Sequence, residues 1–174
     1  AASGWVTITG TENYSTTVDF TVSSAGTTGE HSRTVYVWYK DSVGNISTVA
    51  SDSIILVVTD TTAPSSPTIS INSDNISTSN TVVTLTLSAT DDYGVSEYYA
   101  SETNTTPDST DSGWNSVTST TAYSSTVSFT ISSATSAGSH TRIVYVWFKD
   151  AAGNVSSSAE DSITLVVTDT TAPS

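Results

Sequence analysis

Aspartate and asparagine residues at predicted turns and in one linker are the side chains of this chain best suited to hold a metal ion. Asp91 and Asp92 share one turn, Asp150 and Asn154 share another, and Asp60 begins a proline-containing stretch. Calcium prefers six to eight oxygen ligands, mainly carboxylates and carbonyls. The set predicts a calcium site if the fold gathers it. The alternative is that these are ordinary turn residues, because Asp and Asn favour turns for backbone reasons alone.

Aromatic residues form a second candidate site. Tyr145 and Trp147 alternate with apolar residues, and Tyr36 and Trp38 repeat this arrangement earlier in the chain. Because side chains alternate between the two faces of a strand, the pattern predicts an outward aromatic face, which Tyr99 is expected to join. Such a face can bind sugar rings or protein partners. The alternative is cross-strand packing on a sheet face that loops partly cover.

Catalytic constellations are not found. A hydrolytic triad needs a histidine that a carboxylate orients, and the two histidines, His31 and His140, occupy equivalent places in separate repeats. The chain has no cysteine for a zinc site and no phosphate-binding glycine loop. We therefore expect that it is not an enzyme and that it has no cofactor other than calcium.

The charge balance restricts the partners. The chain has 4 Lys+Arg against 17 Asp+Glu, a formal net charge of -13, which repels nucleic acid and attracts divalent cations. No apolar run approaches the roughly 18 residues of a membrane span, so no membrane insertion is expected. The first residues lack the basic and apolar segments of a signal peptide, so an export signal is expected only upstream of this sequence.

An internal repeat determines where all these residues lie. Residues 1–65 align without a gap on residues 110–174, and about three in five aligned residues are identical. Trp38 thereby returns as Trp147, and residues 56–65 return unchanged as residues 165–174. The period is that of a whole small domain, far longer than one turn of a solenoid.

Short alternating strands and turn residues fill the repeat, and helical signals are nearly absent. In the complete copy we predict seven strands, at residues 68–71, 82–89, 96–101, 113–117, 126–131, 142–149 and 162–168. A turn at residues 91–94 is predicted to separate the second strand from the third. Seven short strands without a helix predict an antiparallel sandwich of two sheets.

The alternation also predicts the core. The inward residues are Val83, Leu85, Leu87, Val144, Val146, Phe148, Ile163, Leu165 and Val167, and in the first copy Ile54, Leu56 and Val58.

Three segments resemble bacterial immunoglobulin-like repeats, which are related to fibronectin type III modules. They are VYVWFKDAAGNVS at residues 144–156, ATDDYGV at residues 89–95 and DTTAP at residues 169–173. The resemblance covers essentially the whole chain and implies tandem antiparallel immunoglobulin-like β-sandwiches, the first copy N-terminally incomplete. It departs from the family where a tyrosine often precedes the sixth strand, because only His140 and Arg142 lie there.

The same resemblance implies a location for the acidic residues. In such sandwiches the incoming linker lies at the end that also carries the loops after the second and sixth strands. Asp60 is then expected near Asp91, Asp92, Asp150 and Asn154. Related adhesin repeats use linker aspartates with calcium to stiffen such joints.

The repeat boundaries predict the domain organisation. We expect a partial repeat with C-terminal strands only at residues 1–60, a stiff proline linker at 61–67, a complete repeat at 68–169 and the start of the next linker at 170–174. Counterparts of residues 66–109 do not precede the first copy. This predicts either a piece of a longer tandem array or strand complementation by a neighbouring chain.

The expected function is mechanical. Near-identical repeats suit a stiff spacer or polymer building block of an extracellular stalk, adhesin or surface filament, with neighbouring copies of the same repeat or chain as partners. The alternative is a glycan- or protein-binding accessory module of a secreted protein, including a secreted polysaccharide-acting enzyme whose catalytic domain lies elsewhere.

Overall fold

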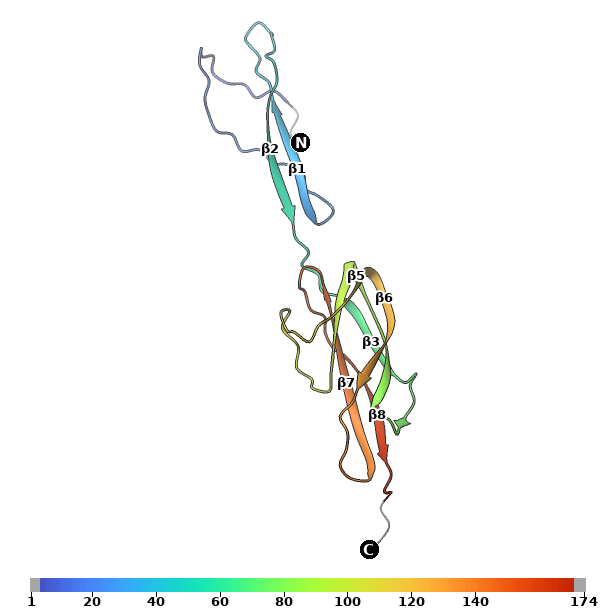
Figure 1. The fold of residues 1–174 in the computed structure, drawn as a ribbon. Helices are drawn as coiled ribbons and strands as arrows, with labels where there is room; N and C mark the ends of the chain where they lie inside the picture. The colour runs from blue at the N-terminus through green and yellow to red at the C-terminus, as the bar shows by residue number, and fades with distance from the viewer. Residues whose placement is uncertain (1–3, 171–174) are drawn as a thin grey trace. The chain divides into compact units, whose positions relative to one another are not determined.

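The computed structural model describes residues 4–170, and the chain divides into two compact units. Unit 1 is Ala1–Asp60 and unit 2 is Thr61–Ser174. Every regular element in the described residues is a β-strand (Figure 1), which confirms the predicted all-β class. Across residues 4–170 no helix has the length and apolar character needed to cross a membrane. Of the linker expected at residues 170–174, residues 171–174 lie outside the described part.

In the part of unit 2 that the structure describes, six strands form one hydrogen-bonded sheet. They are β3 (Ser65–Ile71), β4 (Ser77–Thr78), β5 (Val82–Ser101), β6 (Asn115–Thr130), β7 (Gly138–Asp150) and β8 (Ala159–Val167). The path runs β3-β5-β7-β8-β4, and β6 pairs with β5. All pairings are antiparallel except that of β4 with β8. The predictions that correspond to β3, β7 and β8 are confirmed, and β4 was not predicted.

The predicted separation of the strands at residues 82–89 and 96–101 is wrong. Both belong to β5, and the register with β6 shifts between Thr90 and Val95. The β5–β6 ribbon folds over at this point (Figure 1). The bend needs no separate loop because Asp91 Oδ1 accepts the N–H groups of Tyr93 and Gly94, at 3.0 and 2.7 Å. The predicted strands at residues 113–117 and 126–131 are likewise joined in β6.

The core of unit 2 lies where the alternation predicts. The inward residues of β5, β7 and β8 are fully buried, apart from Val167, which is half-buried: Val83, Leu85, Leu87, Val144, Val146, Phe148, Ile163 and Leu165. Each such side chain contributes about 1.5–3 kcal/mol by leaving water. β3 packs against β7 and β8 without pairing with either strand. The strands therefore surround one core in two layers, an arrangement consistent with a β-sandwich.

The chain enters and leaves unit 2 at opposite ends (Figure 1). Ser65 pairs with Thr90 at the end where β5 bends and where Asp150 pairs with Val95. Val167 pairs with Gly138 at the other end. β7 spans the distance between the two ends with 13 residues, or about 40 Å at the usual rise of a strand.

In the described residues of unit 1, β1 (Gly29–Val37) and β2 (Ala50–Val58) form one antiparallel pair. Its register, from Gly29 opposite Val58, is that of Gly138 opposite Val167 in unit 2. The expectation that Ile54 lies in a core is wrong, because its side chain is 59% exposed, while Leu56 and Val58 are half-buried. Unit 1 contains no counterpart of residues 66–109, which cover these positions in unit 2.

Candidate functional site

An acidic pair lies at the bend of β5. Asp91 is only 6% exposed, and its Oδ2 atom has no hydrogen-bond partner among the residues that the structure describes. A carboxylate oxygen of the exposed Asp92 lies within 4.8 Å of one from Asp91. Burying an anionic oxygen without a donor costs free energy, so such an atom is normally compensated by a proton, a donor or a cation. The carboxylate oxygens of Asp91 and Asp92 are thus the type of ligand that a hard cation such as calcium prefers.

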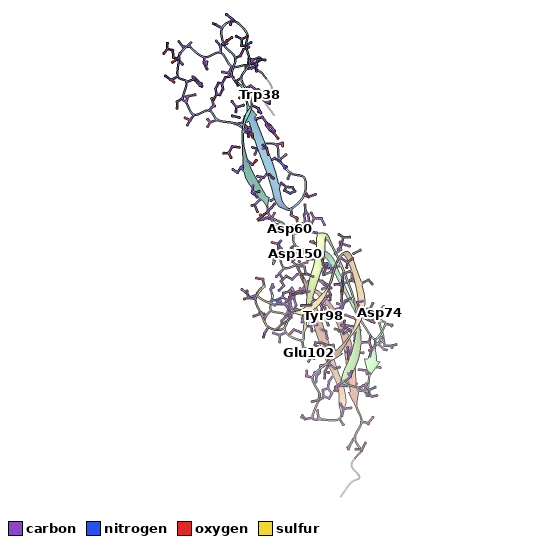
Figure 2. All side chains as sticks on the ribbon, turned by 45° about the horizontal axis from the view of Figure 1, so that its top comes forward. Trp38, Asp60, Asp74, Tyr98, Glu102 and Asp150 are labelled. Carbon is purple, nitrogen blue, oxygen red and sulfur yellow. The ribbon has the colours of Figure 1, made fainter. Side chains whose placement is uncertain are left out.

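Asp150 and Asn154 bind each other instead of joining this pair. The backbone N–H and the Nδ2 atom of Asn154 donate to the two carboxylate oxygens of the buried Asp150, at 2.9 and 2.7 Å. Figure 2 labels Asp150, at the end of β7. These bonds close the turn after β7. The turn-closing alternative therefore describes Asp150 and Asn154, and a role for them in metal binding stays a prediction.

Unit 1 repeats this turn at Asp41 and Asn45. Asn45 donates from its backbone N–H and its Nδ2 atom to Asp41, at 2.8 and 2.7 Å. The side-chain bond from Asn45, followed by its backbone bond, lowers the pKa of Asp41 below the ordinary aspartate value. Asp60 is the last residue of unit 1, whereas Asp91 and Asp92 belong to unit 2. That Asp60 joins Asp91 and Asp92 stays a prediction.

The predicted aromatic face is covered in unit 2, so the expectation that Trp147 presents an accessible ring is wrong. Trp147 is 1% exposed, with ring centroids 6.2 Å from those of Tyr99 and of Tyr145. The segment between β5 and β6 folds onto this face. From that segment, Trp114 meets the Tyr99 ring at 5.6 Å and donates its Nε1–H to the Asp108 carbonyl at 2.8 Å. The cross-strand packing alternative therefore holds for Tyr99, Tyr145 and Trp147.

In unit 1 the equivalent aromatic pair is accessible. Tyr36 is 57% and Trp38 48% exposed. Their ring centroids are 6.2 Å apart, as are those of the half-buried Tyr145 and the buried Trp147 in unit 2. Trp38 is labelled in Figure 2. The local geometry of the pair is thus the same in both units, and only its covering differs.

Two glutamates that the sequence analysis did not single out hold the cations of unit 2. Lys149 Nζ lies 2.7 Å from Glu97 Oε2, donates to the Ser109 carbonyl at 2.7 Å and stands 4.7 Å above the Trp114 ring. Arg142 Nε lies 3.8 Å from Glu102, whose Oε2 accepts the N–H and hydroxyl of Ser132. The sequence contained a signal for these ion pairs. Arg142 and Lys149 fall on one predicted strand, and each needs a carboxylate from a neighbouring part of the fold.

A shallow groove runs along β6 and was not predicted. It encloses about 590 Å³ and is lined by Ser and Thr side chains together with Tyr98 and Tyr123. Burial raises the pKa of both tyrosines. No cluster of charged side chains lines the groove, so its chemistry points to no particular ligand.

Comparisons with protein-family models, with curated proteins and with solved structures found no match to this chain.

Proposed function

We propose that the chain is a structural module, made of tandem immunoglobulin-like sandwiches, that serves as a stiff spacer in an extracellular stalk, adhesin or surface filament. The observation that carries the proposal is the repeat itself, whose two copies keep the same strand register and the same turn network. A chain that enters and leaves unit 2 at opposite ends supports it, because each added copy then adds length.

The strand arrangement suits a load-bearing role. Tension would reach unit 2 at Ser65 of β3 and at Val167 of β8, which lie at opposite ends and pair with β5 and β7. Force directed along paired strands loads many backbone hydrogen bonds together, so they must break as a group. Proline at positions 64 and 67 restricts the backbone of the joint.

Scattering from chains of increasing copy number tests the spacer role. Chains with one, two and three copies of residues 66–174 are expected to show a maximum dimension that rises by about 40 Å per copy, the length of β7. Small-angle X-ray scattering measures this dimension. Copies that fold back on one another would leave it nearly constant and would remove the proposal.

We also propose that a calcium ion binds at the bend of β5. The unpartnered, buried Oδ2 atom of Asp91 supports this, and the nearby Asp92 carboxylate adds a second anionic oxygen. Asp91 and Asp92 would hold the ion, which would tie the bend of β5 to the end of unit 2 that the linker enters. Backbone carbonyls and water would complete the shell of a hard cation.

Removal of calcium is expected to destabilise unit 2. At a calcium concentration about 100 times the Kd, binding adds about 2.7 kcal/mol, which raises the melting temperature by roughly 5 °C or more. Asp91→Asn should abolish the shift between chelator and calcium, whereas the exposed Asp74→Asn in the same unit should keep it. Differential scanning calorimetry measures the shift. Equal melting of the wild-type chain in chelator and in calcium would contradict the site.

A glycan- or protein-binding module is the second candidate function. The exposure of Tyr36 and Trp38 favours it. The same pair is covered in unit 2, so an aromatic platform would not repeat along an array of complete copies. The spacer role therefore has the stronger support.

A further inference from the structure

The second half of β6 is a regular edge strand with one free side. From Ala122 to Thr130 it pairs with β5 in nine consecutive positions, without a shift in register. Among the residues that the structure describes, β5 is the only strand that pairs with β6 (Figure 1). The outer edge of this stretch therefore presents unpaired backbone groups to solvent.

Hydrogen bonds at the end of the ribbon show which residues of β6 bond outward. Ile131 donates its N–H to the Thr81 carbonyl at 2.9 Å, so Ile131 bonds toward β5. Thr84 agrees with this, because both of its backbone groups bond to Asn72 on the β3 side, at 2.8 Å. Consecutive residues of a strand direct their N–H and C=O groups to opposite sides. The backbone groups that point away from β5 are therefore those of alternate exposed residues: Ser124, Thr126 and Ser128.

The other edges of unit 2 are protected, and this one is not. Natural proteins block an edge strand with charge, proline or a covering segment. β3 contains Pro67, and its Ile71 N–H donates to Asp161 Oδ2 at 2.7 Å. β4 covers part of the outer edge of β8. β6 contains neither a proline nor a charged residue in its 16 positions.

The layer that ends in this edge is free of charge. It consists of residues 65–71, 82–90 and 122–130, none of which is acidic or basic, in a chain of net charge -13. Proteins with so large a net charge of one sign repel each other. Along this edge, however, two copies can meet without bringing carboxylates together.

The groove described above lies beside the edge, on its inward face. The inward residues Tyr123 and Val127 line it together with Val117 from the first half of β6. Side chains of an added strand alternate between the same two faces as those of β6. Its inward side chains would therefore lie toward this groove, and apolar ones would find apolar neighbours there.

We propose that two copies of this chain associate by antiparallel pairing of β6 with β6, over residues 122–130. A two-fold axis passes between the two Thr126 residues, and Ser124 of each chain lies opposite Ser128 of the other. The two uncharged layers then become one continuous sheet. The inference goes beyond the spacer role and does not depend on it.

The free backbone groups determine this register. Outward-bonding residues must lie opposite one another, so a shift by one residue would break the pairing. A shift by two would leave residues unpaired at both ends. The proposed register uses all nine residues and places Tyr123 opposite Phe129, an aromatic cross-strand pair on the inward face.

A second copy fits this edge better than another partner does. The edge is self-complementary, because every outward-bonding residue meets an outward-bonding residue across the two-fold axis. A basic protein would gain nothing from an uncharged strand. The first copy of the repeat has Asp19 at the position of Ser128, so residues 13–21 do not offer the same uncharged edge. Each chain thus has one such edge, and the expected product is a dimer.

Cysteine cross-linking of the whole chain tests the register, because the chain has no cysteine of its own. Thr126→Cys places two thiols on residues whose Cα atoms are about 5.5 Å apart, within the disulfide range. It is expected to form covalent dimers at least tenfold faster than Ser124→Cys or Ser128→Cys alone, whose equivalent residues are about 13 Å apart. A mixture of these two variants should cross-link to each other. Thr84→Cys, exposed on the neighbouring strand, gives the rate of random collision.

Sedimentation equilibrium measures the association itself. A pairing of nine residues is small for a protein interface, so the expected Kd is about 100 μM. Ser128→Asp, which introduces the residue of the first copy, is expected to raise the Kd at least tenfold, because a charge on the edge must lose water. Thr84→Asp adds the same charge one strand away and should change the Kd by about twofold or less. Raising NaCl to about 0.5 M should lower the wild-type Kd several-fold, because salt screens the repulsion between the two acidic chains.

Three results would overturn the proposal. The first is a chain that stays monomeric at about 1 mM in this salt. The second is cross-linking of Thr126→Cys no faster than that of Thr84→Cys, or equally fast cross-linking of Ser124→Cys, Thr126→Cys and Ser128→Cys, which would indicate parallel pairing. The third is an association that raised salt abolishes, since that would assign the contact to charged residues elsewhere. None of these results would affect the spacer role.

Discussion

Ile163→Ala is expected to lower the free energy of unfolding of unit 2 by about 2–5 kcal/mol, whereas the equivalent Ile54→Ala in unit 1 should cost less than about 1 kcal/mol. The two isoleucines stand at the same place in the repeat and in the same strand register. Ile163 is 1% exposed and Ile54 59% exposed. Removing a buried side chain loses its transfer free energy and leaves a cavity, and an exposed side chain carries neither cost.

Guanidinium unfolding followed by hydrogen exchange measures both changes, because exchange assigns each transition to a unit. The pair controls for sequence context, since the local segments are nearly the same. Equal losses from the two substitutions would contradict the difference in packing between the units.

Gly94→Ala is expected to destabilise unit 2 by about 2–4 kcal/mol. Gly94 lies at the bend of β5 with a φ of 115°, which L side chains rarely adopt. A Cβ atom there would overlap Ser119 Oγ and lie 3.3 Å from the backbone nitrogen of Thr120 on β6. The substitution therefore combines backbone strain with a clash in the ribbon that folds over.

Gly153→Ala is the matched control for this prediction. Gly153 has a φ of 94°, but its nearest heavy atom, Ser109 Cβ, would be 3.9 Å from the new methyl group. Only the backbone strain remains, so the expected loss is about 1–2 kcal/mol. Thermal unfolding of unit 2 compares the two variants. A smaller loss for Gly94→Ala than for Gly153→Ala would show that the bend tolerates a side chain.

The alternation of apolar residues predicted most of the fold of unit 2, because burial on one face of a strand is a local property of the sequence. The inward residues of β7 and β8 lie where this pattern places them. The single strand β5 was not predicted, because Asp91 and Gly94 are turn residues by type. In the structure, Asp91 accepts backbone N–H groups as it would in a turn, but the chain only bends there and stays within one strand, β5.

The candidate site was less predictable, because the burial of a side chain depends on residues that are far from it in the sequence. Trp38 and Trp147 have nearly the same neighbours in sequence, but one is 48% and the other 1% exposed. In unit 2, Tyr99 of β5 contacts Trp147, and Trp114 packs on Tyr99 in turn. The unpartnered Oδ2 atom of Asp91 could not be foreseen either, since it depends on which donors surround it.

The most direct test of the central claim, that each copy is an independent folded unit that bears tension, is to stretch a chain of several copies of residues 66–174 by atomic force microscopy. Each copy should unfold in one event that releases about 350 Å of chain, which is 109 extended residues less the folded length. A regular series of equal force peaks is the expected result. Smooth extension without peaks, or steps of unequal length, would contradict a load-bearing repeat.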